Sequence, residues 1–168
     1  MNSLYHTDYH QWLTQQVTLL RNHNFEQLDL ENLLEDLELG IKQDVRQLEN
    51  YLINLILHLL KMDYQTSVLR DSVASERVIK GWMDAIDNAK DAISRLIIKN
   101  HSLKQRVEDV LSESYPAGKK GAIREMNRHM PPKYPKLDNS SFPDTCPWSF
   151  DQMMSEDWYP VNGVSLYE

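Results

Sequence analysis

A stripe of apolar residues between Asp29 and Met62 constrains the fold of this chain more than any other feature. The stripe consists of Leu30, Leu34, Leu37, Ile41, Val45, Leu48, Leu52, Ile56 and Leu59. Residues that recur every three or four positions lie on one face of an α-helix, here over roughly eight turns. Between Tyr51 and Leu60, apolar residues occupy other faces as well. We therefore expect one long helix, with that part of it buried on more than one side.

Further segments show helical spacing or good capping residues. We expect helices over about Asp8–Leu20, Ser72–Lys99 and from Ser102 to near Pro116, with a further helical segment over about Ala117–His129, as well as the long helix that Asp29 would cap. Asp8 with Gln11, and Ser102 with Gln105, have the spacing of a capping box. Pro116 is expected to stop or kink the last helix, because proline lacks the amide hydrogen that an inner turn needs.

The composition changes after Met130. Six of the 7 prolines lie between Pro131 and Pro160, where they alternate with large aromatic residues. A flexible linker would not carry so many rings. We therefore expect residues 131–168 to form an irregular arm with a short helix near Trp148–Met154. The predicted architecture is all-α: an antiparallel bundle of about four main helices formed by residues 1–130, with the arm packed on it in a single domain.

Charge and hydropathy indicate a water-soluble protein. The 18 basic and 25 acidic residues leave a net charge of -7, which argues against a general binder of polyanions. The longest apolar run is about half of the roughly 20 residues that a transmembrane helix needs. One cysteine, Cys146, permits no internal disulfide, and no targeting segment is evident. We expect a cytoplasmic protein without membrane association.

Several short motifs occur in a particular order along the chain. They are YHTDYHQWLTQQVTLLR near the N-terminus, LENLLEDLE at Leu30–Glu38, HLLK at His58–Lys61, SLK at Ser102–Lys104 and CPW at Cys146–Trp148. With these motifs in this order, the chain resembles the bacterial domain-of-unknown-function family 29, whose members are common in cyanobacteria. The resemblance implies a small, mostly α-helical protein and carries no activity with it.

The carboxylates Glu31, Glu35, Asp36 and Glu38 lie within two turns of the long helix. Glu38 falls near the edge of the apolar stripe, where it could be partly buried and would then need a partner. One interpretation is a metal or acid/base site formed by Glu35, Glu38 and His58. On one straight helix, however, Glu38 and His58 would be about 30 Å apart. We therefore favour solvated carboxylates that complement the helix dipole.

A narrow polar strip accompanies the apolar part of the long helix. His58 and Lys61 share it with Asn50 and Asn54. Most such strips face water or bond to a neighbouring backbone, and a minority line a pocket; we favour the former. Glu125 and His129, which are four positions apart, are not expected to bind a metal.

Basic residues are concentrated between Gly118 and Lys136, where Glu125 is the only acid. They are Lys119, Lys120, Arg124, Arg128, Lys133 and Lys136. Such a segment can contact phosphates, or it can dock against the acidic arm that follows it or against the acidic start of the long helix. No nucleic-acid-binding module matches the surrounding residues, so we favour docking within the chain.

Motifs for nucleotide binding and for nucleophilic catalysis are absent from the sequence, and no cofactor is expected. The long helix carries more apolar residues than a single bundle seam uses. We therefore expect a non-enzymatic interaction module in which a protein partner, or a second copy in a homodimer, docks on helix 29–62. The alternative is a metal-dependent or acid/base enzyme that uses the carboxylates of residues 31–38 and His58. Nucleic-acid binding through residues 119–136 ranks third.

Overall fold

The computed structural model describes residues 4–70 and 72–164, except for the side chains of residues 72–75. Every regular element in these residues is helical, which confirms the all-α prediction. The α-helices are α1 (Leu4–Thr7), α2 (Tyr9–Arg21), α3 (Leu30–Tyr64), α4 (Ser72–Lys99), α5 (Val107–His129) and α6 (Phe150–Met154). Short 3₁₀ turns occur at Phe25–Gln27, His101–Arg106 and Asn139–Ser141, and a π-helical turn occurs at Gln65–Leu69. Within the described residues, no helix combines the length and the apolar content that a bilayer crossing requires.

The chain divides into two compact units, residues 1–43 and residues 44–168. The boundary lies inside α3, which contributes its first residues to unit 1 and the remainder to unit 2. The expectation of one four-helix bundle over residues 1–130 does not anticipate this division. Because α2 belongs to unit 1, the long helical segments of unit 2 are α4, α5 and the part of α3 from Asp44 onward.

In unit 1, hydrogen bonds join α2 to the start of α3 around the buried side chain of Trp12. The predicted cap at Asp8 is confirmed, since its carboxylate accepts a hydrogen bond of 3.0 Å from the backbone N–H of Gln11. Trp12 Nε1 donates to Asp29 Oδ2 at 2.9 Å. The backbone N–H of Asp29 in turn donates to Gln16 Oε1 at 2.8 Å. Asp29 thus precedes α3 as expected and also ties it to α2.

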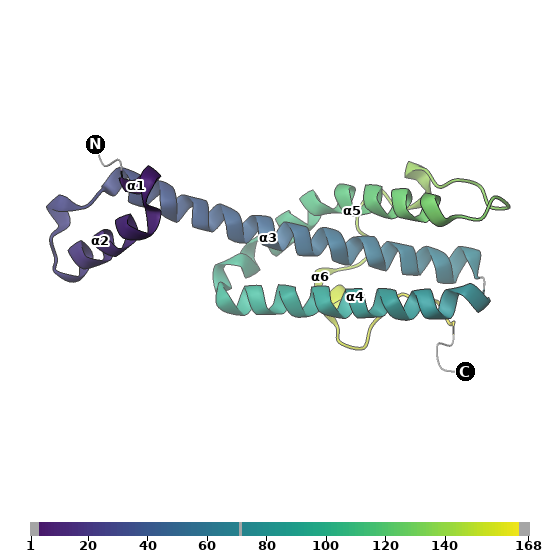
Figure 1. Cartoon of the computed structure of the whole chain (residues 1–168). Coiled ribbons are helices and arrows are strands. Elements are labelled where there is room, and N and C mark those ends of the chain that lie inside the picture. The colour runs from purple at the N-terminus through teal and green to yellow at the C-terminus, as the bar shows by residue number, and fades with distance from the viewer. Residues whose placement is uncertain (1–3, 71, 165–168) are drawn as a thin grey trace. The chain divides into compact units, whose positions relative to one another are not determined.

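Unit 2 is built around the C-terminal part of α3, which lies between α4 and α5 in Figure 1. The turn Gln65–Leu69 and Arg70, whose φ is 48°, reverse the chain, so α4 runs antiparallel to α3. The three helices bury a common core that includes Leu48, Leu52, Leu55, Ile56, Leu59, Leu60, Ile79, Ile86, Ile93, Val107, Val110, Leu111 and Ala122. Leu57, which lies off the main stripe of α3, is buried too. Burial of this segment on more than one side is therefore confirmed.

Two glycines let α5 approach α3 closely. A β-carbon at Gly118 would lie 2.6 Å from Ile56 Cγ2 and 3.2 Å from the carbonyl oxygen of Ile53. A β-carbon at Gly121 would lie 2.6 Å from Leu57 Cδ1. Real β-carbons essentially never come within 3.0 Å of such atoms, so a side chain at Gly118 would push against Ile56 and separate the helices, whereas at Gly121 the flexible end of Leu57 could move aside.

α5 continues through Pro116, so of the two outcomes predicted for this proline, a stop or a kink, the stop is wrong. Proline leaves the carbonyl group four residues earlier, on Ser112, without its helical donor. Pro116 and Ser112 are both exposed, so water can satisfy that carbonyl group. The helix also gains from the core residues that its other face buries, which offsets the lost hydrogen bond.

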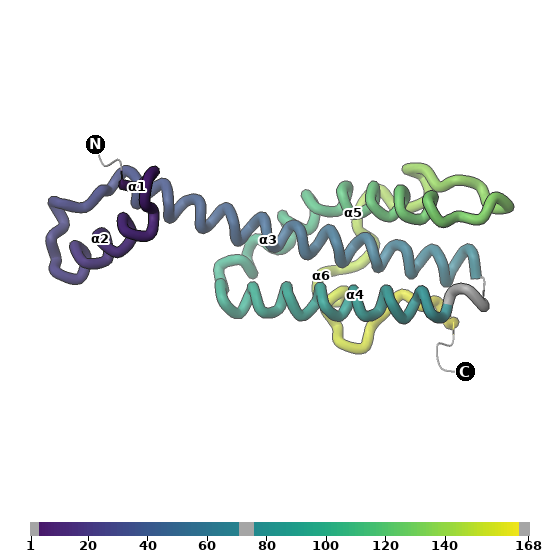
Figure 2. The backbone as a smooth tube through the Cα atoms, viewed as in Figure 1, coloured from purple at the N-terminus to yellow at the C-terminus, as the bar shows by residue number. Residues whose placement is uncertain are grey.

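After α5 the chain doubles back along that helix, as Figure 2 shows. Asn127 holds this return at both ends of its amide: Nδ2 donates to the Leu137 carbonyl at 2.9 Å, and Oδ1 accepts from the Leu137 N–H at 2.7 Å. Further on, Phe142 is buried with its ring edge-to-face against Tyr64, 5.7 Å between centroids. Polar and apolar contacts together hold this part of the arm on the helices.

The end of the arm contacts α4. The short helix predicted near Trp148–Met154 is confirmed as α6, and Ser149 caps it by accepting a hydrogen bond of 3.1 Å from the Gln152 N–H. Lys90 of α4 is buried, and its Nζ donates to the carbonyl oxygens of Ser155 at 2.7 Å and Trp158 at 3.0 Å. Burial lowers the pKa of Lys90, because removing an ammonium group from water disfavours its charged form.

Candidate functional site

The acidic residues at the start of α3 lie in different environments. Glu31, Glu35 and Glu38 are exposed. The expectation that Glu38 is partly buried is wrong, because the apolar stripe beside it is itself exposed. Asp36 instead has a structural partner: Tyr9 Oη lies 2.7 and 2.9 Å from its two carboxylate oxygens. This hydrogen bond joins α3 to α2 within unit 1.

The first part of the long stripe faces solvent. Leu30, Leu34, Leu37 and Ile41, which we call the unit 1 stripe, are between 52% and 65% exposed. Other exposed large apolar residues of unit 1 are Tyr9, Val17, Leu20, Phe25 and Leu39. Unit 1 therefore contains nine of the twelve large hydrophobic residues that are exposed in the described part of the chain. Sequence periodicity cannot separate this exposed part of the stripe from its buried continuation.

His58 belongs to unit 2 and is partly buried. Its Nδ1 lies 2.8 Å from the carbonyl oxygen of Asn54, one turn earlier. Burial lowers the pKa of His58 and favours the neutral ring. The other two candidate ligands, Glu35 and Glu38, belong to unit 1. Among the residues that the structure describes, no group of three or more His, Cys, Asp or Glu is placed to hold a metal ion.

The basic segment contacts its own chain at several points. Lys119 is buried, with Nζ 3.1 Å from the carbonyl oxygen of Pro143 and 3.8 Å from Asp144 Oδ1. Lys136 Nζ donates to the carbonyl oxygen of Asn127 at 2.8 Å, and Lys133 Nζ lies 5.0 Å from the ring centroid of Tyr134. The remaining members, Lys120, Arg124 and Arg128, are exposed.

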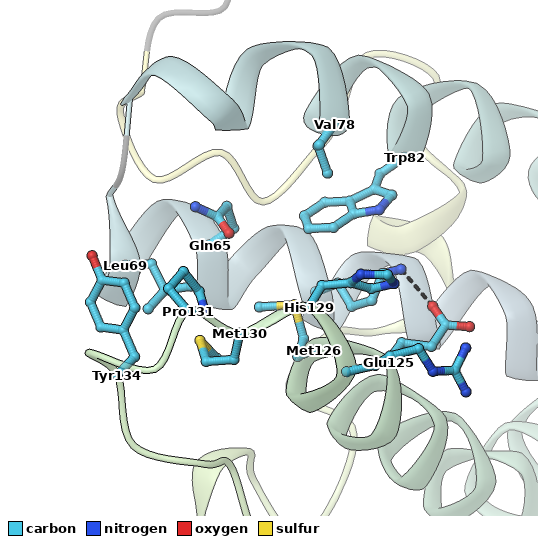
Figure 3. A pocket seen from close by; sticks show the side chains of 12 residues that line it. Gln65, Leu69, Val78, Trp82, Glu125, Met126, His129, Met130, Pro131 and Tyr134 are labelled. Carbon is cyan, nitrogen blue, oxygen red and sulfur yellow. Dashed lines mark hydrogen bonds and ion pairs between the residues drawn. The ribbon is translucent and has the colours of Figure 1, made fainter.

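An open cleft of about 610 Å³ lies in unit 2, and we call it the Trp82 cleft (Figure 3). The end of α3 and the turn after it contribute Lys61, Gln65 and Leu69. α4 contributes Val78 and Trp82. The end of α5 and the chain after it contribute Glu125, Met126, Arg128, His129, Met130, Pro131 and Tyr134. Most of this lining is apolar, and its charged groups gather where α3 faces α5.

An ion pair lies at the charged end of the cleft. Lys61 Nζ is 2.6 Å from Glu125 Oε2 and 4.8 Å from the ring centroid of Trp82, so the cation meets both a carboxylate and an aromatic face. Burial acts to raise the pKa of Glu125, but the hydrogen bond and charge of Lys61 outweigh it, and the pKa is lowered. The paired, charged state is therefore favoured although Lys61 is buried.

Sequence reasoning did not identify this cleft. It assigned Lys61 to a polar strip of the kind that usually faces water, and it set Glu125 and His129 aside as an isolated pair. Lys61 and Glu125 are 64 positions apart, so no local spacing indicates that they meet. Trp82 fits the apolar stripe of α4, and that stripe does not distinguish a core ring from a cleft wall.

The arrangement of the Trp82 cleft is suited to binding. An apolar wall can bury the body of a ligand, and a few charged groups at one end can orient it. Trp82 and Val78 of α4 form one side of the cleft, opposite Met126 and Met130 (Figure 3). Methionine side chains adapt readily to the shape of what they contact.

The fold and the cleft define a small all-α protein with a separate N-terminal helical unit. A family model described as Domain of unknown function DUF29 matches residues 4–159, and the chain belongs to this family. The resemblance inferred from the short motifs is thereby confirmed. No curated protein and no solved structure matches the chain.

Proposed function

We propose that this protein is a non-enzymatic interaction module that docks a helix of a protein partner on the unit 1 stripe. The observation that carries the proposal is the exposure of Leu30, Leu34, Leu37 and Ile41 at intervals of four, three and four residues. These intervals are those of a seam along which two helices pack. Apolar rows of this kind on a protein surface commonly mark interaction sites.

The small size of unit 1 supports the same reading. Segments of about 40 residues rarely bury enough apolar surface to be stable without disulfides, metals or a partner. Trp12 is the one large hydrophobic residue that is fully buried among the described residues of unit 1. Covering the stripe with a partner would add about 25 cal/mol of stabilisation for each Å² of apolar surface removed from water.

Charge indicates the chemistry of the partner. Residues 4–43 contain seven acidic and two basic residues, which leaves a net charge of -5. Glu31 and Glu38 directly follow stripe residues and are exposed, so they would border a docked helix. A helix with an apolar stripe and basic flanks would complement this face, whereas an acidic one would be repelled. We therefore assign the stripe to a basic amphipathic helix.

Two synthetic heptad peptides test this assignment. Both carry leucine at the seam positions; one has lysine and the other has glutamate at the flanking positions. By calorimetry, we expect saturable binding of the lysine peptide to the full-length chain and binding at least about tenfold weaker for the glutamate peptide. Raising the salt concentration should weaken the lysine peptide's binding, since the charges involved are exposed.

A pair of matched variants locates the binding. Leu37→Asn should weaken the lysine peptide roughly tenfold, because it places an amide in the seam. Ile98→Asn is the control: Ile98 is similarly exposed, at 69% against 65% for Leu37, but lies on α4 in unit 2. Equal binding of the two peptides, or equal effects of the two variants, would contradict the proposal.

Sedimentation equilibrium separates a basic partner from a homodimer. We expect a monomer, because pairing two copies of unit 1 would bring together two units in which residues 4–43 each carry a net charge of -5. A dimer that Leu37→Asn dissociates would assign the stripe to a second copy of the chain and overturn the choice of partner.

A further inference from the structure

We infer that the Trp82 cleft binds a small amphipathic anion, that is, a carboxylate or sulfonate carried on an aromatic or aliphatic body. The inference does not depend on the proposed docking face, because the cleft is formed by residues of unit 2. It depends on the size, the apolar wall and the charge of the cleft.

Size and lining fit a small organic molecule. The volume of about 610 Å³ falls within the range of roughly 300–1,000 Å³ that is typical of small-molecule sites. Val78 is 44% exposed, and Trp82, Met130 and Tyr134 are only partly buried. The fold therefore leaves apolar surface at the wall that a ligand could remove from water. Trp82 and Tyr134 offer ring faces, and Met130 offers a side chain that adapts to the ligand.

Charge selects an anion over a cation. Among the lining residues, Glu125 is the one carboxylate, and it faces the basic side chains of Lys61 and Arg128. Lys61 is already paired with Glu125 at 2.6 Å, so Arg128 supplies the excess positive charge. A positive lining is notable in a chain with a net charge of -7. A cationic ligand would compete with Lys61 for its carboxylate, whereas an anion would complement the excess.

Arg128 is the group most suited to hold the anion. Its side chain is exposed at the end of α5, so it can turn towards a ligand without breaking a core contact. A guanidinium group offers parallel N–H donors that match the two oxygens of a carboxylate. The apolar body would then lie along Trp82 and Val78 (Figure 3).

Two probes that share one body and differ in charge test the inference. Naphthalene-2-carboxylate and 2-naphthylmethylammonium are titrated into the full-length chain by calorimetry. We expect saturable binding of the carboxylate and binding at least about tenfold weaker for the ammonium compound. The carboxylate should also raise Tm in a concentration-dependent way, since it binds the folded state.

Two variants at exposed positions of the cleft, each with a matched control, identify the site. Val78→Glu and Arg128→Glu should each weaken the carboxylate roughly tenfold or more, by placing a negative charge in the site. Ile98→Glu on α4 and Arg124→Glu on α5 introduce the same charge at exposed positions outside the cleft and should leave binding unchanged. Because all four positions are exposed, melting curves should show that the variants remain folded.

Any of the following results would overturn the inference. The first is no saturable binding of the carboxylate up to about 1 mM. The second is equal or tighter binding of the ammonium compound. The third is binding that Val78→Glu and Arg128→Glu weaken no more than their controls do. Loss of binding in Leu37→Asn would also count against it, because that residue belongs to unit 1.

Discussion

Lys61 on α3 and Glu125 on α5 form an ion pair of 2.6 Å beside the indole ring of Trp82 on α4. Three helices therefore meet at one charged contact. A buried cation with a single carboxylate partner is sensitive to the loss of that partner, because the charge left behind has no compensation.

We predict that Glu125→Gln lowers the free energy of unfolding by about 1–3 kcal/mol, less than for a fully buried pair because Glu125 is one-third exposed. Urea unfolding measures the loss. The double variant Lys61→Met/Glu125→Gln should recover part of it by removing the unpaired cation. A double variant less stable than Glu125→Gln would show that Lys61 is held mainly by contacts other than the carboxylate.

The same pair should produce an acid-dependent loss of stability. The pKa of Glu125 is lowered in the folded state from an ordinary value of 4.5. As the pH falls below 4.5, the unfolded chain takes up a proton before the folded chain does. The stabilisation that the ion pair gives above pH 4.5 therefore decreases as the pH approaches the folded-state pKa. Between about pH 6 and pH 3 the free energy of unfolding should therefore fall more steeply with decreasing pH for the wild type than for Glu125→Gln.

Gly118→Ala should destabilise the protein by about 1–3 kcal/mol, since its β-carbon would meet Ile56 and the backbone of Ile53. Gly81→Ala on α4 is the matched control, because a β-carbon there meets nothing within 4 Å. That variant should stabilise the protein by up to about 1 kcal/mol through helix propensity. Chemical denaturation gives both values, and effects of the same sign would contradict the close approach of α3 and α5.

His58→Gln should flatten the dependence of stability on pH just below neutrality. The pKa of His58 is lowered by burial, so on acidification the unfolded chain binds a proton first, and stability falls as the pH drops below about 6.5. An equal slope in the wild type and in His58→Gln would contradict the prediction. Unfolding free energies at several pH values between about 7 and 5 test this.

Tyr115→Phe should cost about 1 kcal/mol at neutral pH, because Tyr115 Oη donates a hydrogen bond of 2.7 Å to the Pro143 carbonyl oxygen. Burial raises the pKa of Tyr115 to about 12. Between pH 10 and that value the unfolded chain loses the phenolic proton first, so stability falls as the pH rises. In Tyr115→Phe this contribution to the fall of the unfolding free energy above pH 10 should be absent, which urea unfolding at several alkaline pH values measures.

Local features of the sequence predict the helices well. The expected bounds of α4 agree with the structure, and the cap at Asp8 forms as its spacing indicates, whereas Ser102, predicted to cap a helix, lies inside the 3₁₀ turn His101–Arg106. Side-chain caps act over three residues, so the local sequence indicates where one can form. The sequence does not show whether Pro116 ends the helix, because the cost of the proline depends on whether water reaches the Ser112 carbonyl group. That access depends on the tertiary position of the helix.

The sequence does not predict the tertiary features. Leu34 and Leu52 belong to one periodic stripe, yet Leu34 is exposed and Leu52 is fully buried. Periodicity shows which side of a helix is apolar, but it does not show whether anything covers that side. The Trp82 cleft likewise depends on Lys61 and Glu125 meeting across 64 positions, a pairing without any local signature.

Besides its buried side chains, main-chain oxygens hold the C-terminal arm on the helices. Tyr115 and Lys119 bond to the oxygen of Pro143, Lys90 to those of Ser155 and Trp158, and Thr66 to that of Pro160. Every amino acid supplies the same oxygen, so these four arm positions can be replaced without removing an acceptor. A one-residue deletion between them would instead misalign all later oxygens with their donors. Away from its buried side chains, such as Phe142 and Met153, the arm should thus tolerate exchanges at these acceptor positions but not changes in length.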